Sequence, residues 1–199
     1  ANRMIKITDH VYAETKYHGA NVGCIVTQEG LVLVESPMLP EDARDWREQL
    51  RSVSDKEIAF LISTDHHFDH VLGNGFLTRR TVAHHIAYKG IQYLEGNLQR
   101  EFDNFFPGLY ESRKEEFERI PIVLPQITFE SKLNLFMGDR DIELTHVGGH
   151  SAATIMIYVP EDKVLFTGDN VEIGQHSFAG FGRFGLWIEM LRTVEQMNV

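Results

Sequence analysis

The segment that decides both fold and site reads Ser63-Thr64-Asp65-His66-His67-Phe68-Asp69-His70. Five of its eight side chains can bind a metal ion. It follows the apolar run Ile58–Ile62, which is predicted to be a buried strand. Ligands at the end of a rigid strand, with flexible backbone just beyond, are typical of a metal site. The alternative, a solvated loop in which Asp69 caps a helix starting near His70, is the less favoured interpretation.

The spacing within this segment separates its side chains into sets. Asp65, His67 and Asp69 lie two residues apart, so they point the same way while the chain stays extended. His70 follows Asp69 directly and is expected to point elsewhere, where it could serve a second ion. His66 is expected to point to the opposite face from Asp65 and His67, which makes it the less favoured alternative as a ligand.

Two later strands also end in metal-binding side chains. One is Val147-Gly148-Gly149-His150-Ser151, and the other is Phe166-Thr167-Gly168-Asp169. Alone, His150 is equally well read as a turn histidine that faces water, and Asp169 is weak evidence because aspartates are common in turns. Because three strand ends from separate parts of the chain all deliver His or Asp, the set together predicts one metal site.

Length and composition limit the classes of protein to which this chain can belong. A chain of 199 residues that is 43% hydrophobic can form one domain with a sizeable core, so we expect a single domain over 1–199. The formal net charge of -10 argues against nucleic-acid and anionic-membrane partners. The single cysteine, Cys24, excludes an internal disulfide and is expected to be a buried hydrophobe. No apolar run reaches the roughly 18 residues of a membrane helix, so a cytoplasmic location is the default expectation.

Periodicity predicts a mixed α/β chain. Strands are expected over 4–7, 11–13, 21–27, 31–34, 58–62, 81–84, 127–129, 133–136, 142–147, 154–159 and 164–167. Helices are expected over 40–53, 86–94, 111–119 and 186–197, and residues 178–185 form a loop rich in Gly and Phe. The aromatics between Phe102 and Tyr110 are expected to pack in the core, with a pocket wall or a homodimer contact as alternatives.

These motifs together resemble the metallo-β-lactamase-fold metallohydrolases over about residues 5–198. The resemblance rests on the segment 64–70, on Gly149-His150-Ser151 and on Thr167-Gly168-Asp169, with flanking strands that also agree. It implies an αββα sandwich with two divalent metal ions. The chain ends at Val199, where the family continues, so the resemblance implies a domain without its last strand and helix.

The resemblance also implies a ligand set. One ion is expected on Asp65, His67 and His150, and a second on Asp69 and His70, with Asp169 bridging the two. Where the family has His, this chain has Asp65, which moves the preference from zinc towards manganese or iron without excluding zinc. No Gly-His turn follows Asp169, so the family's last ligand is expected beyond Val199. Glu35 stands where relatives carry a supporting Asp.

The function that the resemblance implies is metal-dependent hydrolysis of a small molecule. A metal-bound hydroxide would attack an ester, thioester, lactone, β-lactam or phosphodiester, with Asp69 as the catalytic residue that orients or deprotonates the nucleophile. His18 and His176 are candidate substrate contacts, and residues 178–182 are a candidate apolar lid. Two alternatives stay open: a mononuclear iron dioxygenase of the same fold, and a non-enzymatic metal-binding protein.

Overall fold

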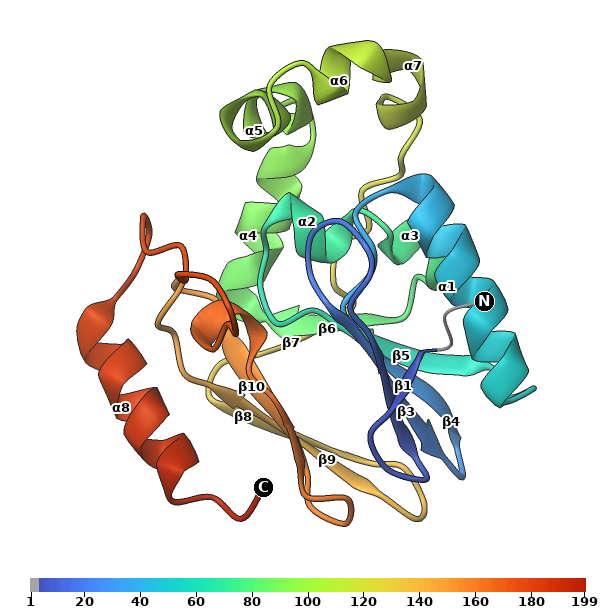
Figure 1. Cartoon of the computed structure of the whole chain (residues 1–199), viewed down its shortest axis with the longest axis vertical. Helices are drawn as coiled ribbons and strands as arrows, with labels where there is room; N and C mark the ends of the chain where they lie inside the picture. The colour runs from blue at the N-terminus through green and yellow to red at the C-terminus, as the bar shows by residue number, and fades with distance from the viewer. Residues whose placement is uncertain (1–3) are drawn as a thin grey trace.

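Two facing β-sheets form the centre of the molecule (Figure 1). The structure is a computed structural model that describes residues 4–199. The first sheet has the order β1-β2-β3-β4-β5-β6-β7, with strands Ile5–Lys6, Val11–Glu14, Val22–Thr27, Gly30–Val34, Ile58–Ile62, Thr81–His84 and Ile127–Phe129. The second has the order β11-β10-β9-β8, with strands Val164–Phe166, Ile155–Val159, Asp141–His146 and Lys132–Phe136.

Strand direction divides the first sheet. β1 to β4 pair antiparallel, whereas β4, β5, β6 and β7 pair parallel. Parallel neighbours need crossover connections, and α1 (Pro40–Val53) makes the one between β4 and β5. As a result, β5 and its neighbours deliver their carboxyl ends to one edge of the sheet.

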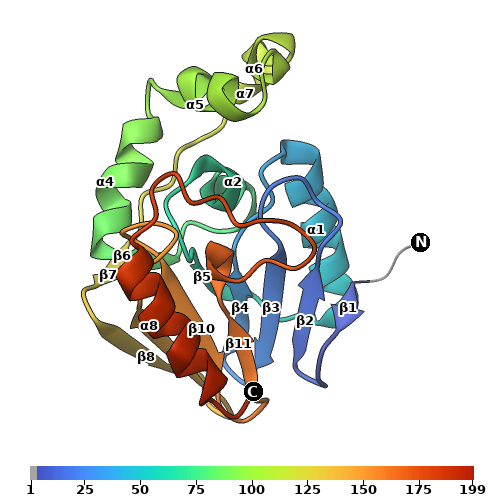
Figure 2. The same cartoon turned by 60° about the vertical axis from the view of Figure 1, so that its left-hand side comes forward.

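Helices cover the outer faces of both sheets, so the layers run helix, sheet, sheet, helix (Figures 1 and 2). The helices are α1, α2 (Phe68–Val71), α3 (Asn74–Leu77), α4 (His85–Leu94), α5 (Leu98–Phe105), α6 (Leu109–Ser112), α7 (Lys114–Phe117) and α8 (Phe184–Glu195), with a 3₁₀ turn at Gly168–Asn170. Within residues 4–199, no helix is long and apolar enough to cross a bilayer.

Apolar side chains from both sheets fill the space between them. Ile25, Val32 and Ile62 of the first sheet pack in the same cluster as Leu144 and Ile157 of the second, and all five are fully buried. On the other face of the first sheet, Trp46 and Leu50 of α1 pack beside Cys24, Leu33 and Leu61. Cys24 is a buried free thiol, as predicted.

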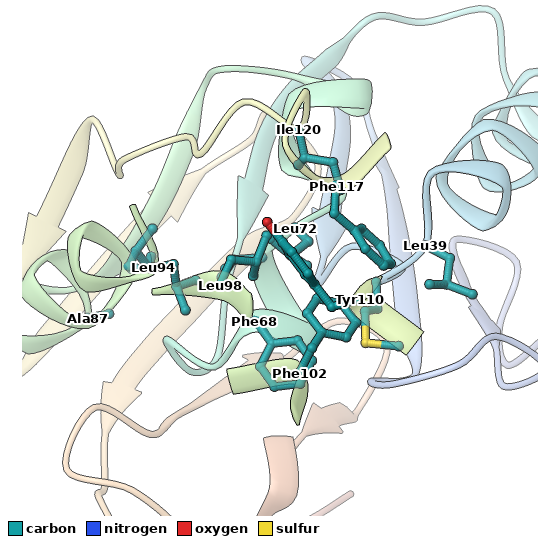
Figure 3. Close-up of a cluster of buried hydrophobic side chains, with 14 of the residues drawn as sticks. Leu39, Phe68, Leu72, Ala87, Leu94, Leu98, Phe102, Tyr110, Phe117 and Ile120 are labelled. Carbon is teal, nitrogen blue, oxygen red and sulfur yellow. The ribbon is translucent and has the colours of Figure 1, made fainter. Parts of the chain in front are cut away.

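A third core cluster joins α2 to the helices α4–α7, and Figure 3 shows its side chains. Phe102 is fully buried, and its ring lies 4.7 Å from that of Phe68 and 4.5 Å from that of Phe117. Phe68 follows His67 directly in the chain. The helical layer therefore fixes the backbone that carries the metal-binding segment.

Helix α8 lies alongside the second sheet (Figures 1 and 2). Its Trp187 and Met190 are buried, and the indole Nε1 of Trp187 donates to the carbonyl of Asn170 at 2.8 Å. The helix is thus tied to the turn that contains Asp169.

The predicted αββα sandwich is confirmed, and most predicted elements agree within a few residues. The stretch 111–119, predicted as one helix, is instead the end of α6 and the separate α7, with Arg113 between them outside helical geometry. The aromatic residues near Pro107 have two different roles. Phe102 and Tyr110 are core residues, whereas Phe105 and Phe106 line a cavity. Gly108, at a φ of 81°, takes the left-handed conformation that separates α5 from α6.

A pair of stacked histidines, the buried His84 and the partly buried His146, connects the two sheets. His84 and His146 stack with ring centroids 3.7 Å apart. His84 donates through Nε2 to the carbonyl of Glu130 at 2.7 Å, and its Nδ1 accepts from the backbone N–H of Ile86. The contact at Nδ1 needs the neutral ring, because a protonated Nδ1 cannot accept a hydrogen bond. Burial, together with the neighbouring His146 and His85, outweighs the opposing hydrogen bond to Glu130 and lowers the pKa of His84 to about 4.

We therefore expect acid to destabilise the protein through His84. Between the ordinary pKa of about 6.5 and the folded value, the unfolded chain binds a proton that the folded chain refuses, so the free energy of unfolding falls as pH falls. The expected loss from His84 between pH 7 and pH 5 is about 2 kcal/mol. Urea unfolding at both pH values should show that His84→Asn reduces this difference, while His176→Asn, at an exposed position, leaves it unchanged. An equal pH dependence in wild type and His84→Asn would contradict this assignment.

Candidate metal centre

The segment after β5 changes conformation at His67. His67 is extended, with φ -66° and ψ 151°, and α2 begins at Phe68. The condition under which Asp65, His67 and Asp69 would share one face, an extended chain, therefore ends at His67, and helical geometry turns Asp69 away from the other two. Instead, Asp69 lies with His70 and Asp169.

Asp65 is at the centre of the first ligand cluster. Asp65, His66 and His67 each offer one ligand atom, and these atoms lie within 4.8 Å of one another. The Oδ2 atom of Asp65 is 3.3 Å from Nδ1 of His67 and 3.8 Å from Nε2 of His150. The rings of His67 and His150 have centroids 5.2 Å apart. The structure thus brings together the Asp65, His67 and His150 set that the resemblance implied.

His66 also belongs to this cluster, contrary to the expectation from strand alternation. Its Nδ1 atom lies 2.8 Å from Oδ1 of Asp65. The ring packs on α4 at Gly90, where a Cβ would lie only 2.2 Å from Cδ2 of His66. Because Gly90 has no side chain, it leaves room for the ring of His66. This glycine is the feature of the sequence that could have indicated the position of the ring.

The second cluster consists of Asp69, His70 and Asp169, whose ligand atoms also lie within 4.8 Å of one another. His70 is buried, and its Nε2 atom is 3.3 Å from Oδ2 of Asp169 and 3.8 Å from Oδ2 of Asp69. The same Oδ2 atom of Asp169 is 3.7 Å from Nε2 of His150. Asp169 therefore lies between the two clusters, where the resemblance places a bridging ligand.

A glycine turn and Asn170 position His150. Gly149 has φ 104°, and a Cβ there would lie 2.4 Å from Oδ1 of Asn170. This space admits the Asn170 side chain, whose Oδ1 accepts from the backbone N–H of His150 at 2.7 Å and whose Nδ2 donates to the Gly148 carbonyl at 2.8 Å. Sequence reasoning did not identify Asn170, although it directly follows Asp169.

Further polar contacts orient the ligands. The Ser151 hydroxyl donates to Oδ1 of Asp65 at 2.8 Å. Nδ1 of His150 lies 2.8 Å from the Phe178 carbonyl, which directs Nε2 into the site. Glu35 is buried, accepts from Thr64 and places Oε1 3.2 Å from Nδ1 of His70. Glu35 thus makes the supporting contact that its position in the sequence suggested.

The electrostatics of the two clusters favour paired charges. Burial pushes the pKa of Asp65 up, but His66 and His67 outweigh it and hold that pKa well below its usual range. Burial opposes the charged form of His70, but the carboxylates of Asp169, Glu35 and Asp69 outweigh it and raise the pKa of His70 well above its usual value. A cation at the second cluster would take the place of that proton, so metal affinity should rise with pH.

The ligand clusters open into a cavity of about 240 Å³. Four candidate ligands line one part of it: His67, Asp69, His150 and Asp169. Its other walls are phenylalanine rings, including Phe178 and Phe181 from the predicted lid. A second cavity of about 450 Å³ adjoins it and shares His67, Phe68 and Phe181.

The two candidate substrate histidines lie outside these walls. His18 is 72% exposed, and its Nδ1 atom lies 3.8 Å from Oδ2 of Asp42. It is next to Gly19, on a loop whose Ala20 N–H donates to the Asp69 carbonyl. His176 is exposed and belongs to the segment between Asp169 and the lid. Neither residue lines the cavity at the ligand clusters, so their contact with substrate stays a prediction.

The donor set fits a pair of divalent cations. Carboxylate oxygens and imidazole nitrogens suit zinc, manganese and iron, and all six predicted ligands lie in the two clusters or within 4 Å of one of their members. Asp65, His70 and His150 are almost fully buried, and buried charges of this kind are normally paired or bound to a metal. The arrangement fits a metal centre at the end of an apolar cavity.

The chain belongs to the metallo-beta-lactamase superfamily, whose family model matches residues 16–198. It is 21% identical over 187 residues to a metallo-beta-lactamase type 2 of Elizabethkingia meningoseptica, covering 90% of this chain and 66% of that protein. It is 24% identical over 140 residues to a hydroxyacylglutathione hydrolase of Pelagibacter ubique, covering 65% and 44%. The chain thus spans 66% or less of the length of these two relatives.

Solved structures share the fold at low identity. A metallo-beta-lactamase from Pontibacter korlensis superposes with a TM-score of 0.71 at 19% identity, covering 98% of this chain and 85% of its own. A stereoselective inverting sec-alkylsulfatase from a Pseudomonas species gives a TM-score of 0.78 at 17% identity, covering 98% and 36%. Since these proteins are named for different substrates, the fold alone does not choose a substrate for this chain.

Glu35 offers a test of the support around His70. Glu35→Gln keeps the size of the side chain but removes the carboxylate that faces Nδ1 of His70. We expect metal affinity to fall by about 10- to 100-fold, as for other residues that orient a metal-binding histidine. Competition with a chromogenic chelator measures this affinity. Glu48→Gln, on the exposed face of α1, is the matched control, and equal affinity in both variants would contradict the role of Glu35.

Proposed function

We propose that this chain is a metal-dependent hydrolase whose centre holds two divalent ions. The observation that carries the proposal is the position of Asp169, whose Oδ2 lies within 4 Å of both His70 and His150. Asp65, His67 and His150 would hold one ion, and Asp69 and His70 the other, with Asp169 shared. Zinc suits these ligands, and the carboxylate of Asp65 makes manganese and iron competitors.

When bound, such ions lower the pKa of a water to about 7 and polarise the oxygen of the bond to be broken. The protein then has to orient the ligands and move a proton. Asp69 is the candidate catalytic residue, because it is 27% exposed by side chain, lines the cavity and is 3.8 Å from Nε2 of His70. In this proposal its carboxylate orients the nucleophile or takes its proton.

The surrounding residues fix the orientation of the candidate metal ligands during the reaction. Ser151 holds Asp65, the Phe178 carbonyl holds His150, and Glu35 holds His70. The phenylalanine walls limit the access of water to the reacting bond, which strengthens electrostatic interactions inside the cavity. The candidate substrates are esters, thioesters, lactones, β-lactams and phosphodiesters.

The test is hydrolysis of this substrate panel by metal-loaded protein. Activity should disappear on chelation, return when zinc, manganese or iron is added back, and be absent from His67→Ala. Hydrolysis that survives both chelation and His67→Ala would overturn the proposal.

A further inference from the structure

Among residues 4–199, the cavity at the candidate metal centre is lined by candidate metal ligands and by phenylalanine rings. Besides four candidate ligands, its lining consists of five phenylalanines: Phe68, Phe105, Phe106, Phe178 and Phe181. They come from α2, from α5 and the residue after it, and from the segment that precedes α8. Three parts of the chain therefore direct apolar rings to the space beside one polar centre.

The rings form a continuous wall. Phe105 and Phe178 meet edge to face with centroids 5.7 Å apart, and Phe178 and Phe181 are 5.8 Å apart. Phe181 is 5.7 Å from the ring of His67. The wall thus leads from α5 across the lid to a candidate metal ligand.

Three of these rings differ from core residues in their exposure. Phe105, Phe178 and Phe181 are 42%, 46% and 58% exposed, whereas Phe102 is fully buried. Core packing therefore does not account for them. An apolar group that entered the cavity would remove their exposed surface from water, which is favourable.

Hydrogen bonds hold the lid in place. The Phe178 carbonyl is bonded to Nδ1 of His150, and the backbone N–H of Arg183 donates to the Gly149 carbonyl at 2.7 Å. Between them, the N–H of Gly182 donates to the Ala179 carbonyl at 3.0 Å. Both ends of the lid are therefore attached to the His150 segment, so that the walls are formed before a ligand binds.

We infer that this cavity is a specificity subsite for an alkyl chain or phenyl ring joined to the bond that is hydrolysed. The link to a hydrolysed bond rests on the proposed function. Binding of the apolar group to the cavity does not depend on turnover. Phe178 and Phe181 are the specificity-determining residues.

The direct test is binding of 1-alkanols, from butanol to octanol, to the zinc-loaded protein by calorimetry. The hydroxyl is constant in this series, so the change per methylene reports the apolar walls alone. We expect the dissociation constant to fall about fourfold for each methylene until the cavity is filled. In the Phe178→Ala/Phe181→Ala variant this change should fall below about twofold.

Controls separate the subsite from general surface effects. Phe136→Ala removes an equally large ring that is 72% exposed on β8, and it should keep the fourfold change. Phe105→Ala changes the α5 end of the same wall and serves if the double variant does not fold, as judged by circular dichroism. A wild-type series without chain-length dependence, or a dependence unaltered by both Phe178→Ala/Phe181→Ala and Phe105→Ala, overturns the inference.

The same series distinguishes the two proposals. Chain-length-dependent binding without hydrolysis of any panel substrate would retain the subsite and reject the hydrolase. Hydrolysis of a panel substrate without chain-length dependence in alkanol binding would retain the hydrolase and reject the subsite.

Discussion

Asp169→Asn is expected to lower kcat/KM by about a thousandfold and to reduce the metal content from two ions per chain to one or none. The variant keeps the size of the side chain but removes the charge that lies between His70 and His150. Loss of a bound ion removes several kcal/mol of transition-state stabilisation, and each 1.36 kcal/mol corresponds to tenfold in rate. Steady-state kinetics and elemental analysis of the same preparation measure both effects.

The matched control for this experiment is Asp103→Asn. Asp103 is an exposed acid on α5 and is absent from both ligand clusters, so this variant should keep wild-type rate and metal content. If Asp169→Asn also retained both, Asp169 would not be a shared ligand.

The second large effect is expected in stability, from Phe102→Ala. Phe102 is fully buried among Phe68, Tyr110 and Phe117, so its removal leaves a cavity in the helical cluster (Figure 3). The expected cost in free energy of unfolding is about 3–5 kcal/mol. Urea unfolding followed by circular dichroism measures it.

Phe105→Ala, three residues further along the same helix, provides the comparison. Phe105 is 42% exposed, so its removal should cost less than about 1.5 kcal/mol. Equal losses in the two variants would show that Phe102 and Phe105 have the same structural role, against the division into core and cavity wall.

The three strand ends were predictable from local sequence, although the strands lie in two sheets: β5 is in the parallel part of the first sheet, and β9 and β11 flank β10 in the antiparallel second sheet and so run in the same direction. The apolar runs before Ser63, Val147 and Thr167 were visible in sequence, and so were the His and Asp that follow them. The resemblance to a family supplied the grouping of Asp69 with His70 and Asp169. Spacing alone gave a different grouping, because it could not show that α2 starts at Phe68 and ends the extended series.

Contacts between distant segments were the part that the sequence did not reveal. Ser151 donates to Asp65 across 86 positions, and Asn170 supports His150 from 20 positions away. No periodicity links such residues, since the folded backbone alone brings them together. The ring of His66 is a similar case: alternation placed it on the far face, but the space over Gly90 allows it to lie beside Asp65.

The proposed metal centre requires that His67, His150 and Asp169 surround divalent cations, and anomalous X-ray scattering from cobalt-loaded crystals measures whether they do. We expect two anomalous peaks per chain, one about 2.0–2.2 Å from imidazole nitrogens of both His67 and His150, and one bound by His70, with Asp169 contacting both. Crystals that diffract well and contain cobalt in the solution, but show no anomalous peak at these side chains, would contradict it.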